Sequence, residues 1–473
     1  MERLAGIDAS FLYMETPQVH MSVGFACILD PGDSGYDADA VMKHVEERAS
    51  CHRVFRRRLA RVPFDLHHPL WVDDPDFDVI RHVHRTALPA PGGPEEFGAM
   101  VGRLSSAPLD RAKPLWEIWV IEGLEGGRLG FVLRTHHSVV DGVSGAGLLM
   151  HFFDKSRTTI APPAPLPTEP DKLPTDAELF AYALRSRMMA PVELGRTLGR
   201  TLKKASALFR DQISEGRPSG TRPLGAPRTP FNASVSSRRN LATMRVSLQD
   251  IRQIKKALDC TVNDVILATA GGGLRTYLQK RDALPEESLT AACPVSVRTE
   301  AQSLEFNNKV DVLWTTLATD TDDPIKRTER IHASTLIAKT EFKAMGGDTL
   351  QSWAEFAGPR VFHVAVRAYS SQHLADRHRP VHNLVISNVP GPREALYLAG
   401  LKLHAVYPTG PVMEGMGLNL TVYSYGGDVD FGFFVDSKLV PDAWDLARAA
   451  KGAFEELRES VRSRPEPPRP DPG

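Results

Sequence analysis

The amino-acid sequence predicts a mixed α/β protein made of two halves, and three observations support this. Strand patterns alternate with helix patterns in both halves of the 473-residue chain. Two strand pairs are joined by glycine turns, at Gly126-Gly127 and at Gly426-Gly427-Asp428. A Pro-rich stretch at 161–174 separates the halves. The predicted parts are a first half at 1–155, a linker at 156–230, a second half at 231–461 and a disordered tail at 462–473.

The elements of the first half follow from hydrophobic periodicity and from turn residues. Strands alternate apolar and polar residues, whereas helices repeat apolar residues every three or four positions. Asp37 is the expected cap of the first long helix. The predicted elements are a short initial segment at 4–13, strands at 21–29, 118–121 and 129–135, strand and loop at 64–80, and helices at 38–50, 92–104 and 143–153.

The linker contains a helix pattern at 175–214 with leucines on one stripe and basic residues around it. Such a helix can lie on an anionic membrane or lipid-droplet surface. Packing its leucines against the protein is the ordinary alternative, and both stay open. In the second half, the same periodicities predict strands at 241–246, 289–297, 384–387, 418–425 and 429–435, and helices at 248–258, 261–277, 325–343 and 441–461.

Composition excludes several classes of function. The chain has 57 Lys and Arg against 58 Asp and Glu, so its net charge gives no reason to expect nucleic acid. Its four cysteines are scattered without a CxxC pair, which argues against zinc sites and a disulfide framework. The N-terminus lacks the apolar run of a signal peptide, and no window approaches about 18 uninterrupted apolar residues. We therefore expect a cytoplasmic protein.

The clearest chemical signal is the stretch 134–142, Arg-Thr-His-His-Ser-Val-Val-Asp-Gly, which joins a strand end to a Gly-rich helix start. A histidine with a pKa of about 6.5 can take a proton from a nucleophile at neutral pH. His137 and Asp141 lie four residues apart, so they can face each other across one turn, or Asp141 can cap the helix. Gly142 then tolerates backbone angles that other residues resist. A structural histidine pair with a helix cap is the ordinary explanation, but the flanking strand and glycines favour chemistry.

Other catalytic signatures are missing from the sequence. Gly142, Gly145 and Gly147 do not fit GxGxxG, and GxxxxGK[ST] does not occur, so neither dinucleotide fingerprint nor P-loop is present. No GxSxG elbow occurs either, which disfavours a serine acyl-enzyme.

Several motifs, in a fixed order along nearly the whole chain, resemble those of one family. They are Leu4 to Leu12 (LAGIDASFL), Pro114 to Glu117 (PLWE), His136 to Gly142 (HHSVVDG), Asn263-Asp264, Pro294 to Arg298 (PVSVR) and Ser387 to Pro392 (SNVPGP). With them the chain is identified as a member of the bacterial wax ester synthase/acyl-CoA:diacylglycerol acyltransferase family, most similar to the actinobacterial triacylglycerol synthases. HHxxxDG alone is shared with peptide-synthetase condensation domains and identifies only acyl transfer.

The resemblance implies a fold with two chloramphenicol acetyltransferase-like halves, each an α/β sandwich of the CoA-dependent acyltransferase kind, joined by the helical linker. The active site would lie in a tunnel between them. Because only the first half carries HHxxxDG, one site per chain follows.

The resemblance also implies direct transfer, with His137 as the general base. His137 would remove a proton from the hydroxyl of a diacylglycerol or a long-chain alcohol as that oxygen attacks the thioester of a fatty acyl-CoA. Acyl-CoA is then a co-substrate, and neither a metal nor another cofactor is expected. Asp141 is expected to pair with an arginine, with Arg298 as the candidate, and so to hold the loop rigid. His136 would orient its neighbour or line the pocket.

The remaining motif residues are assigned supporting roles. Leu115 and Trp116 are expected to support the site by packing in the core. Asn263, Asp264 and the turn containing Asn388, Pro390 and Gly391 would shape the tunnel or the interface between the halves. Helix capping by the Thr261 and Asp264 pair, and turn chemistry at 388–392, explain these residues equally well.

The expected partners are fatty acyl-CoA, the acceptor lipid and, through the basic linker helix, the inner membrane or lipid droplets as a peripheral surface. Two other functions stay open. One is acyl transfer from a carrier protein in polyketide or peptide assembly. The other is a non-catalytic lipid-binding or droplet-coating protein that retains the fold.

Overall fold

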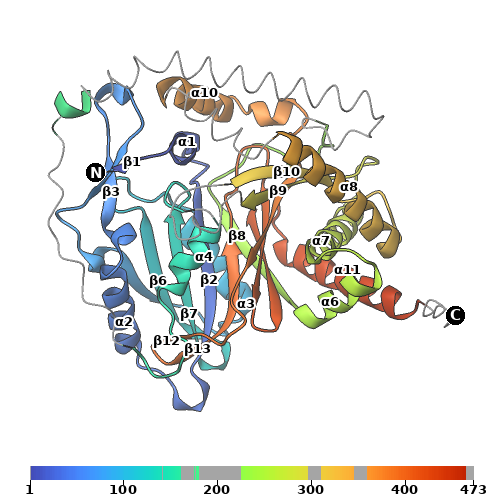
Figure 1. The fold of residues 1–473 in the computed structure, drawn as a ribbon, viewed down its shortest axis with the longest axis horizontal. Coiled ribbons are helices and arrows are strands. Elements are labelled where there is room, and N and C mark those ends of the chain that lie inside the picture. The colour runs from blue at the N-terminus through green and yellow to red at the C-terminus, as the bar shows by residue number, and fades with distance from the viewer. Residues whose placement is uncertain are drawn as a thin grey trace.

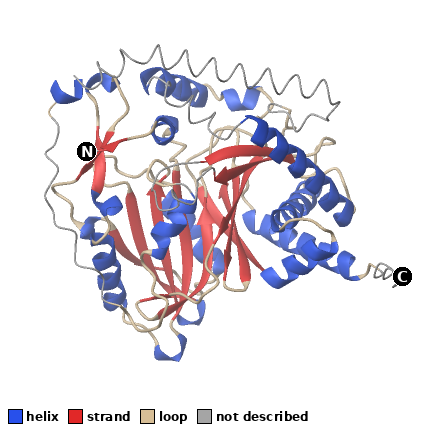
Figure 2. Cartoon of the chain, in the orientation of Figure 1, coloured by secondary structure: helices blue, strands red, loops and turns tan. Residues whose placement is uncertain are grey.

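The computed structural model describes residues 2–140, 142–160, 175, 177–180, 225–296, 310–345 and 359–464. Two six-stranded mixed sheets form its centre, and a small three-stranded sheet lies beside the N-terminus. Figure 2 shows the strands gathered in the middle of the molecule, with most helices outside them. The predicted mixed α/β class with two sheet-containing halves is thereby confirmed.

The first large sheet has the order β12-β13-β2-β7-β6-β5. Its strands β2, β7 and β6 are antiparallel neighbours, whereas β5 runs parallel to β6. Strands β12 and β13 come from far along the chain and pair onto β2, so the second half contributes to the first sheet. The bounds are β2 Ser22–Asp30, β5 Val83–Ala87, β6 Trp116–Leu124, β7 Arg128–His136, β12 Tyr397–Leu398 and β13 Leu401–Thr409.

Helices α2 (Ala38–Ser50) and α4 (Gly142–Met150) bury apolar residues in a core with the strands of this sheet. Helix α3 (Pro94–Ser105) packs instead in a separate core that also includes Leu241 and Phe434 of the second sheet. A Cβ added at Gly98 would lie 2.0 Å from the carbonyl oxygen of Leu241. Only a glycine lets α3 approach that strand so closely, and this contact ties the two sheets together.

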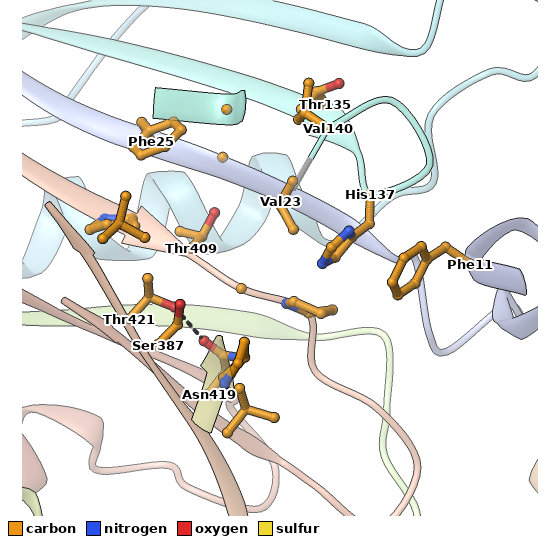
Figure 3. Close-up of a pocket in the computed structure, with 18 of the residues that line it drawn as sticks. Phe11, Val23, Phe25, Thr135, His137, Val140, Ser387, Thr409, Asn419 and Thr421 are labelled. Atoms are coloured by element: carbon orange, nitrogen blue, oxygen red, sulfur yellow. Dashed lines mark hydrogen bonds between the residues drawn. The ribbon is translucent and has the colours of Figure 1, made fainter. Parts of the chain in front are cut away.

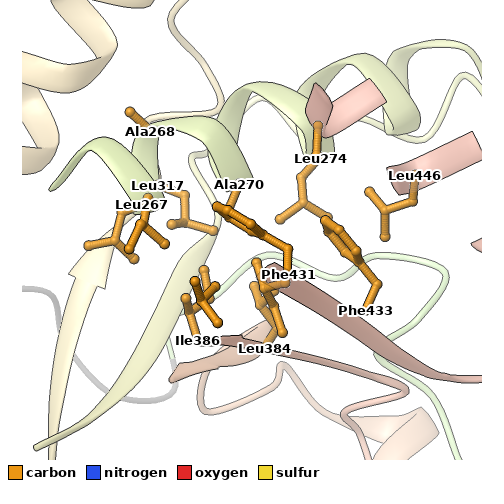
Figure 4. Close-up of a cluster of buried hydrophobic side chains, with 14 of the residues drawn as sticks. Leu267, Ala268, Ala270, Leu274, Leu317, Leu384, Ile386, Phe431, Phe433 and Leu446 are labelled. Carbon is orange, nitrogen blue, oxygen red and sulfur yellow. The ribbon is translucent and has the colours of Figure 1, made fainter. Parts of the chain in front are cut away.

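The second large sheet has the order β10-β9-β11-β14-β15-β8, and β11 runs parallel to both its neighbours. Figure 4 shows its core, where Leu274 and Leu446 from helices meet Phe431 and Phe433 from β15. The strand bounds are β8 Arg239–Ser247, β9 Thr290–Ser296, β10 Val310–Thr316, β11 Leu384–Pro390, β14 Leu418–Tyr425 and β15 Asp428–Asp436. The helix bounds are α6 Leu248–Ala257, α7 Val262–Gln279, α8 Pro324–Met345 and α11 Ala443–Arg462.

Helices α1 (Gly6–Met14) and α10 (Pro359–Ser371) lie together at the top of the molecule in Figure 1, away from α6 and α7. The small sheet contains β1 (Glu2–Arg3), β4 (Leu70–Asp73) and β3 (Arg57–Ala60). Short 3₁₀ helices lie at Gly32–Ser34, Arg53–Arg56, Pro63–Asp65, Val79–Arg81, Glu125–Gly127 and Leu374–Arg377.

Most of the predicted linker helix, and residues 465–473 of the predicted tail, lie outside the described residues. The elements that the sequence patterns did not predict include β5, β10, β13 and α10. Within the described part of the chain, no helix combines the length and the apolar composition that crossing a membrane requires.

Candidate active site

A cavity of about 720 Å³ lies between the two large sheets and is drawn in Figure 3. The first half contributes apolar side chains from α1, β2, β7 and α4. The second half contributes the end of β11, strand β14 and the segment that follows β13. Most of the wall is apolar, and a cavity of this size and character suits a long acyl chain.

The two adjacent histidines stand at the end of β7, where three backbone hydrogen bonds fix the chain. The amide of His136 donates to the carbonyl of Leu115 on one side, at 3.0 Å, and the amide of His137 donates to the carbonyl of Met21 on the other, at 2.8 Å. The amide of Val139 then donates back to the carbonyl of His136 at 2.9 Å. These bonds fix the backbone at both histidines.

The ring of His137 lines the cavity, and Phe11 of α1 stacks on it. The ring centroids are 4.0 Å apart and the planes are inclined by 16°. An offset or parallel aromatic neighbour restricts the rotation of an imidazole. His137 thus presents a titratable group to an apolar space, and packing sets the orientation of its ring.

His136 is 1% exposed and does not line the cavity. Its Nδ1 accepts a hydrogen bond from the amide of Ser138 at 3.0 Å, so the proton of the neutral ring sits on Nε2. Burial, with Arg111 and His137 nearby, holds the pKa of His136 well below its usual range. This direction favours the neutral form of His136, and its ring bonds the loop through the amide of Ser138.

Glu15, just past the end of α1, faces His136 from behind. Its Oε2 lies 3.9 Å from Nε2 of His136 and accepts a hydrogen bond from Nε of Arg111 at 2.7 Å. Burial raises the pKa of the Glu15 carboxyl, while Arg111 and Arg134 act in the opposite direction. This polar cluster supports the histidine pair on the side away from the cavity.

Leu115 and Trp116 are buried, and neither lines the cavity. The carbonyl of Leu115 accepts a hydrogen bond from the amide of His136, so Leu115 supports the site through its backbone. Nε1 of Trp116 donates to the carbonyl of Phe55 at 2.7 Å, and the indole stacks on His82 with centroids 4.5 Å apart. Trp116 belongs to the core beneath the site.

The wall contributed by the second half carries polar groups. Asn388 and Pro390, at the end of β11, both line the cavity. Asn419 and Thr421 of β14 line it too, and Oγ1 of Thr421 donates to Oδ1 of Asn419 at 2.8 Å (Figure 3). Gly391 turns away, and a Cβ there would lie 2.4 Å from the carbonyl oxygen of Ser424.

Asn263 and Asp264 do not line this cavity. Asp264 is fully buried and completes a capping box with Thr261 at the start of α7. Its carboxylate also accepts hydrogen bonds from Nδ1 of His332 at 2.7 Å and from Oγ1 of Thr335 at 2.8 Å. Asp264 therefore caps α7, as the helix-capping explanation expects. Its carboxylate also links α7 to α8.

Three of the predicted site residues are not fully placed. Asp141 and Arg298 lie outside the described residues, and Gly142 is the first residue of α4. Within the described ranges, no group of three or more His, Cys, Asp or Glu side chains could hold a metal ion.

Sequence patterns did not assign roles to Phe11, Glu15, Asn419 or Thr421. Phe11 lies in the first of the motifs that resemble the family, at 4–12, and this motif is the sequence feature that could have pointed to it. Asn419 and Thr421 are alternate residues of a correctly predicted strand, so period-two alternation already places them on one face. Only the folded chain shows that this face lines the same cavity as His137.

Comparisons with known proteins show which family the chain is similar to. The model of the wax ester synthase/diacylglycerol acyltransferase catalytic domain matches residues 4–266, and that of the WS/DGAT C-terminal domain matches residues 306–458. A Mycobacterium tuberculosis protein whose name describes a diacylglycerol O-acyltransferase is 36% identical over 472 residues, covering 98% of this chain and 92% of the relative. Another from that organism is 33% identical over 475 residues, covering 99% of each.

Solved structures are similar over the same length. The wax ester synthase/diacylglycerol acyltransferase from Marinobacter aquaeolei VT8 has a TM-score of 0.70 at 27% identity, covering 97% of this chain and 100% of that chain. The first condensation domain of the calcium-dependent antibiotic synthetase has a TM-score of 0.59 at 16% identity, with 98% and 96% covered. At that identity the second likeness concerns the fold alone.

Proposed function

Because the chain belongs to the wax ester synthase/diacylglycerol acyltransferase family, we propose that His137 is the general base of its acyl transfer, in the cavity between the two sheets. The family transfers fatty acyl groups from acyl-CoA to diacylglycerol or to alcohols. The observation that supports our assignment is the His137 ring lining a large, mostly apolar cavity built from both halves of the chain.

In the proposed step, His137 accepts the proton of the acceptor hydroxyl while that oxygen attacks the thioester carbonyl carbon. The resulting tetrahedral intermediate breaks its carbon–sulfur bond, and the CoA thiolate leaves. The imidazolium then returns the proton to the sulfur, so the enzyme ends in its starting state. No residue of the chain is acylated.

The surroundings of His137 suit this role. Backbone hydrogen bonds at Met21 and Leu115 and the stacked ring of Phe11 hold the imidazole in place before substrate arrives. The apolar walls keep water from competing with the acceptor hydroxyl for the thioester. We propose that Asp141 pairs with Arg298 to hold the loop that follows, as the family resemblance implies.

We further propose that the protein is cytoplasmic and reaches its lipid acceptor at the inner membrane or a lipid droplet through the basic helix expected at 175–214. Its support is the sequence pattern of leucines flanked by Arg196, Arg200, Lys203 and Lys204. Flotation with anionic and neutral vesicles tests this proposal. Replacing the four basic residues by glutamine should abolish flotation with anionic vesicles, and unchanged flotation would reject it.

CoA release by the purified protein tests the reaction itself. Palmitoyl-CoA is supplied with dioleoylglycerol or with hexadecanol, and the free thiol is measured together with the lipid product. We expect release that depends on the acceptor and matches the ester formed. The carrier-dependent and the non-catalytic alternatives both predict no acceptor-dependent release.

A further inference from the structure

A smaller cavity of about 300 Å³ lies behind the end of β11. Helices α6 and α7 form one side of it, and the turn after β11 forms another, together with the hairpin between β14 and β15. Asn388 and Pro390 line both this cavity and the large one that contains His137. The end of β11 is therefore a wall that the two cavities share.

Two arginines, Arg252 of α6 and Arg393 of the turn after β11, line the smaller cavity. Both are exposed, and among the described residues that line this space none has an acidic side chain. Within the described part of the chain, no hydrogen bond or ion pair engages either guanidinium group. Lys255 and Lys256 follow one turn later on α6 and add to the positive charge.

Three acidic residues on or beside the elements that line this cavity already have other partners. Asp250 pairs with Arg458 at 3.1 Å, Asp428 with Arg245 at 3.4 Å, and Glu394 with Lys155 at 3.1 Å. Arg252 and Arg393 thus remain available for an anionic ligand. An arginine can bind phosphate oxygens through two parallel N–H groups. A site without carboxylates favours such binding, because no side chain competes with the phosphate for the guanidinium group.

A third cavity, of about 890 Å³, lies between α1 and α10 and could compete for such a ligand. It contains the exposed arginines Arg61 and Arg367, but Glu15, Asp65 and Asp110 line it as well. It shares no lining residue with the cavity of His137. In Figure 1, α1 and α10 lie at the top of the molecule, far from α6.

From these contrasts we infer that Arg252 and Arg393 bind the phosphates of the CoA nucleotide. The pantetheine arm then passes the end of β11, beside Asn388 and Pro390, and brings the thioester to His137. The acceptor lipid is left free to enter from another side. This inference rests on the proposed function, because it assigns the nucleotide site of the same reaction.

The test compares two acyl donors with the double variant Arg252→Gln/Arg393→Gln in the full-length chain. Palmitoyl-CoA carries the nucleotide, whereas the palmitoyl thioester of N-acetylcysteamine does not. We expect KM for palmitoyl-CoA to rise about tenfold, or about 1.4 kcal/mol, with kcat unchanged. KM for the truncated thioester should not change. An equal loss with both donors, or no loss with either, would overturn the inference.

The variant Arg61→Gln/Arg367→Gln is the matched control, because it removes two exposed arginines from the competing cavity. Its kinetics with palmitoyl-CoA should equal those of the wild type, and a selective rise in its KM would move the nucleotide site there. Thermal unfolding of both double variants checks that each is folded.

Calorimetric titration with adenosine 3′,5′-bisphosphate tests the site without turnover. The wild type should bind this nucleotide fragment, and the Arg252→Gln/Arg393→Gln variant should lose that binding. If the wild type transfers no acyl group, the proposed function fails, whereas the titration still decides whether the two arginines form a nucleotide site. Equal binding by both proteins would reject the site.

Discussion

Phe11 and His137 stack with ring centroids 4.0 Å apart and planes inclined by 16°. Phe11 comes from α1, and His137 follows the central strand β7, so the N-terminal helix covers the histidine proposed as the general base. The same segment places Glu15 behind His136. The residues around α1 therefore contact both histidines, one through an aromatic ring and one through a carboxylate.

Replacing Phe11 by alanine removes the ring that limits rotation of the imidazole. Aromatic pairs contribute about 0.5 to 1.5 kcal/mol, so we expect kcat to fall by roughly two- to tenfold with a small change in thermal stability. Phe11→Tyr keeps the ring and serves as the control. An unchanged kcat in the alanine variant would show that the stack does not position His137.

Replacing Glu15 by glutamine keeps the shape of the side chain but removes the charge that Arg111 meets. The free energy of unfolding should fall by about 2 kcal/mol, because the partly buried Arg111 loses its anionic partner. Urea denaturation measures this, and turnover should fall as the support of His136 weakens. Glu95, whose pair with Arg448 is largely exposed, gives the control Glu95→Gln, which should change stability by less than about 0.5 kcal/mol.

Replacing Asp264 by asparagine should destabilise the second half at neutral pH. Burial alone would raise the pKa of the Asp264 carboxyl. Hydrogen bonds from His332, Thr261 and Thr335 have the larger combined effect, so the pKa lies below its usual value. A lowered carboxyl pKa stabilises the fold above the unfolded value of about 3.9, and this contribution is lost as pH falls through the folded pKa. The stability gap between wild type and variant should therefore be large at pH 7 and narrow below about pH 4. A gap independent of pH would contradict the assignment.

Replacing Trp116 by phenylalanine tests whether this residue acts through the core. The variant leaves the carbonyl of Phe55 without its donor, which should lower the free energy of unfolding by about 1 to 3 kcal/mol. KM for both substrates should stay near the wild-type value, because the indole does not line the cavity. A large rise in KM with unchanged stability would instead indicate contact with substrate.

Local patterns predicted the elements that carry the histidines. The alternation before His136 and the hairpin at Gly426 are local features, and both are present in the fold. The strand β13 was missed because its burial alternates only at its start and is continuous from Ala405 onward. Its identity as a strand comes from pairing with β2, far away in the sequence, which no local period encodes.

The candidate site divides in the same way. His137, Leu115 and Asn388 lie in motifs that can be recognised along the sequence, and the structure brings them to one region. Glu15 and Asn419 matter through what faces them across the fold, and such long-range neighbours leave no periodic signal. That Arg252 and Arg393 line one cavity without an acidic side chain among its described lining residues is likewise a property of the packed chain alone.

The most direct test of the central claim is the rate of CoA release by His137→Ala beside the wild type, with palmitoyl-CoA and the better acceptor. General base catalysis contributes about 10²- to 10⁴-fold, so kcat should fall by at least about a hundredfold while binding of palmitoyl-CoA and thermal stability are retained. A folded His137→Ala variant that transfers acyl groups at the wild-type rate would contradict the assignment of His137 as the base.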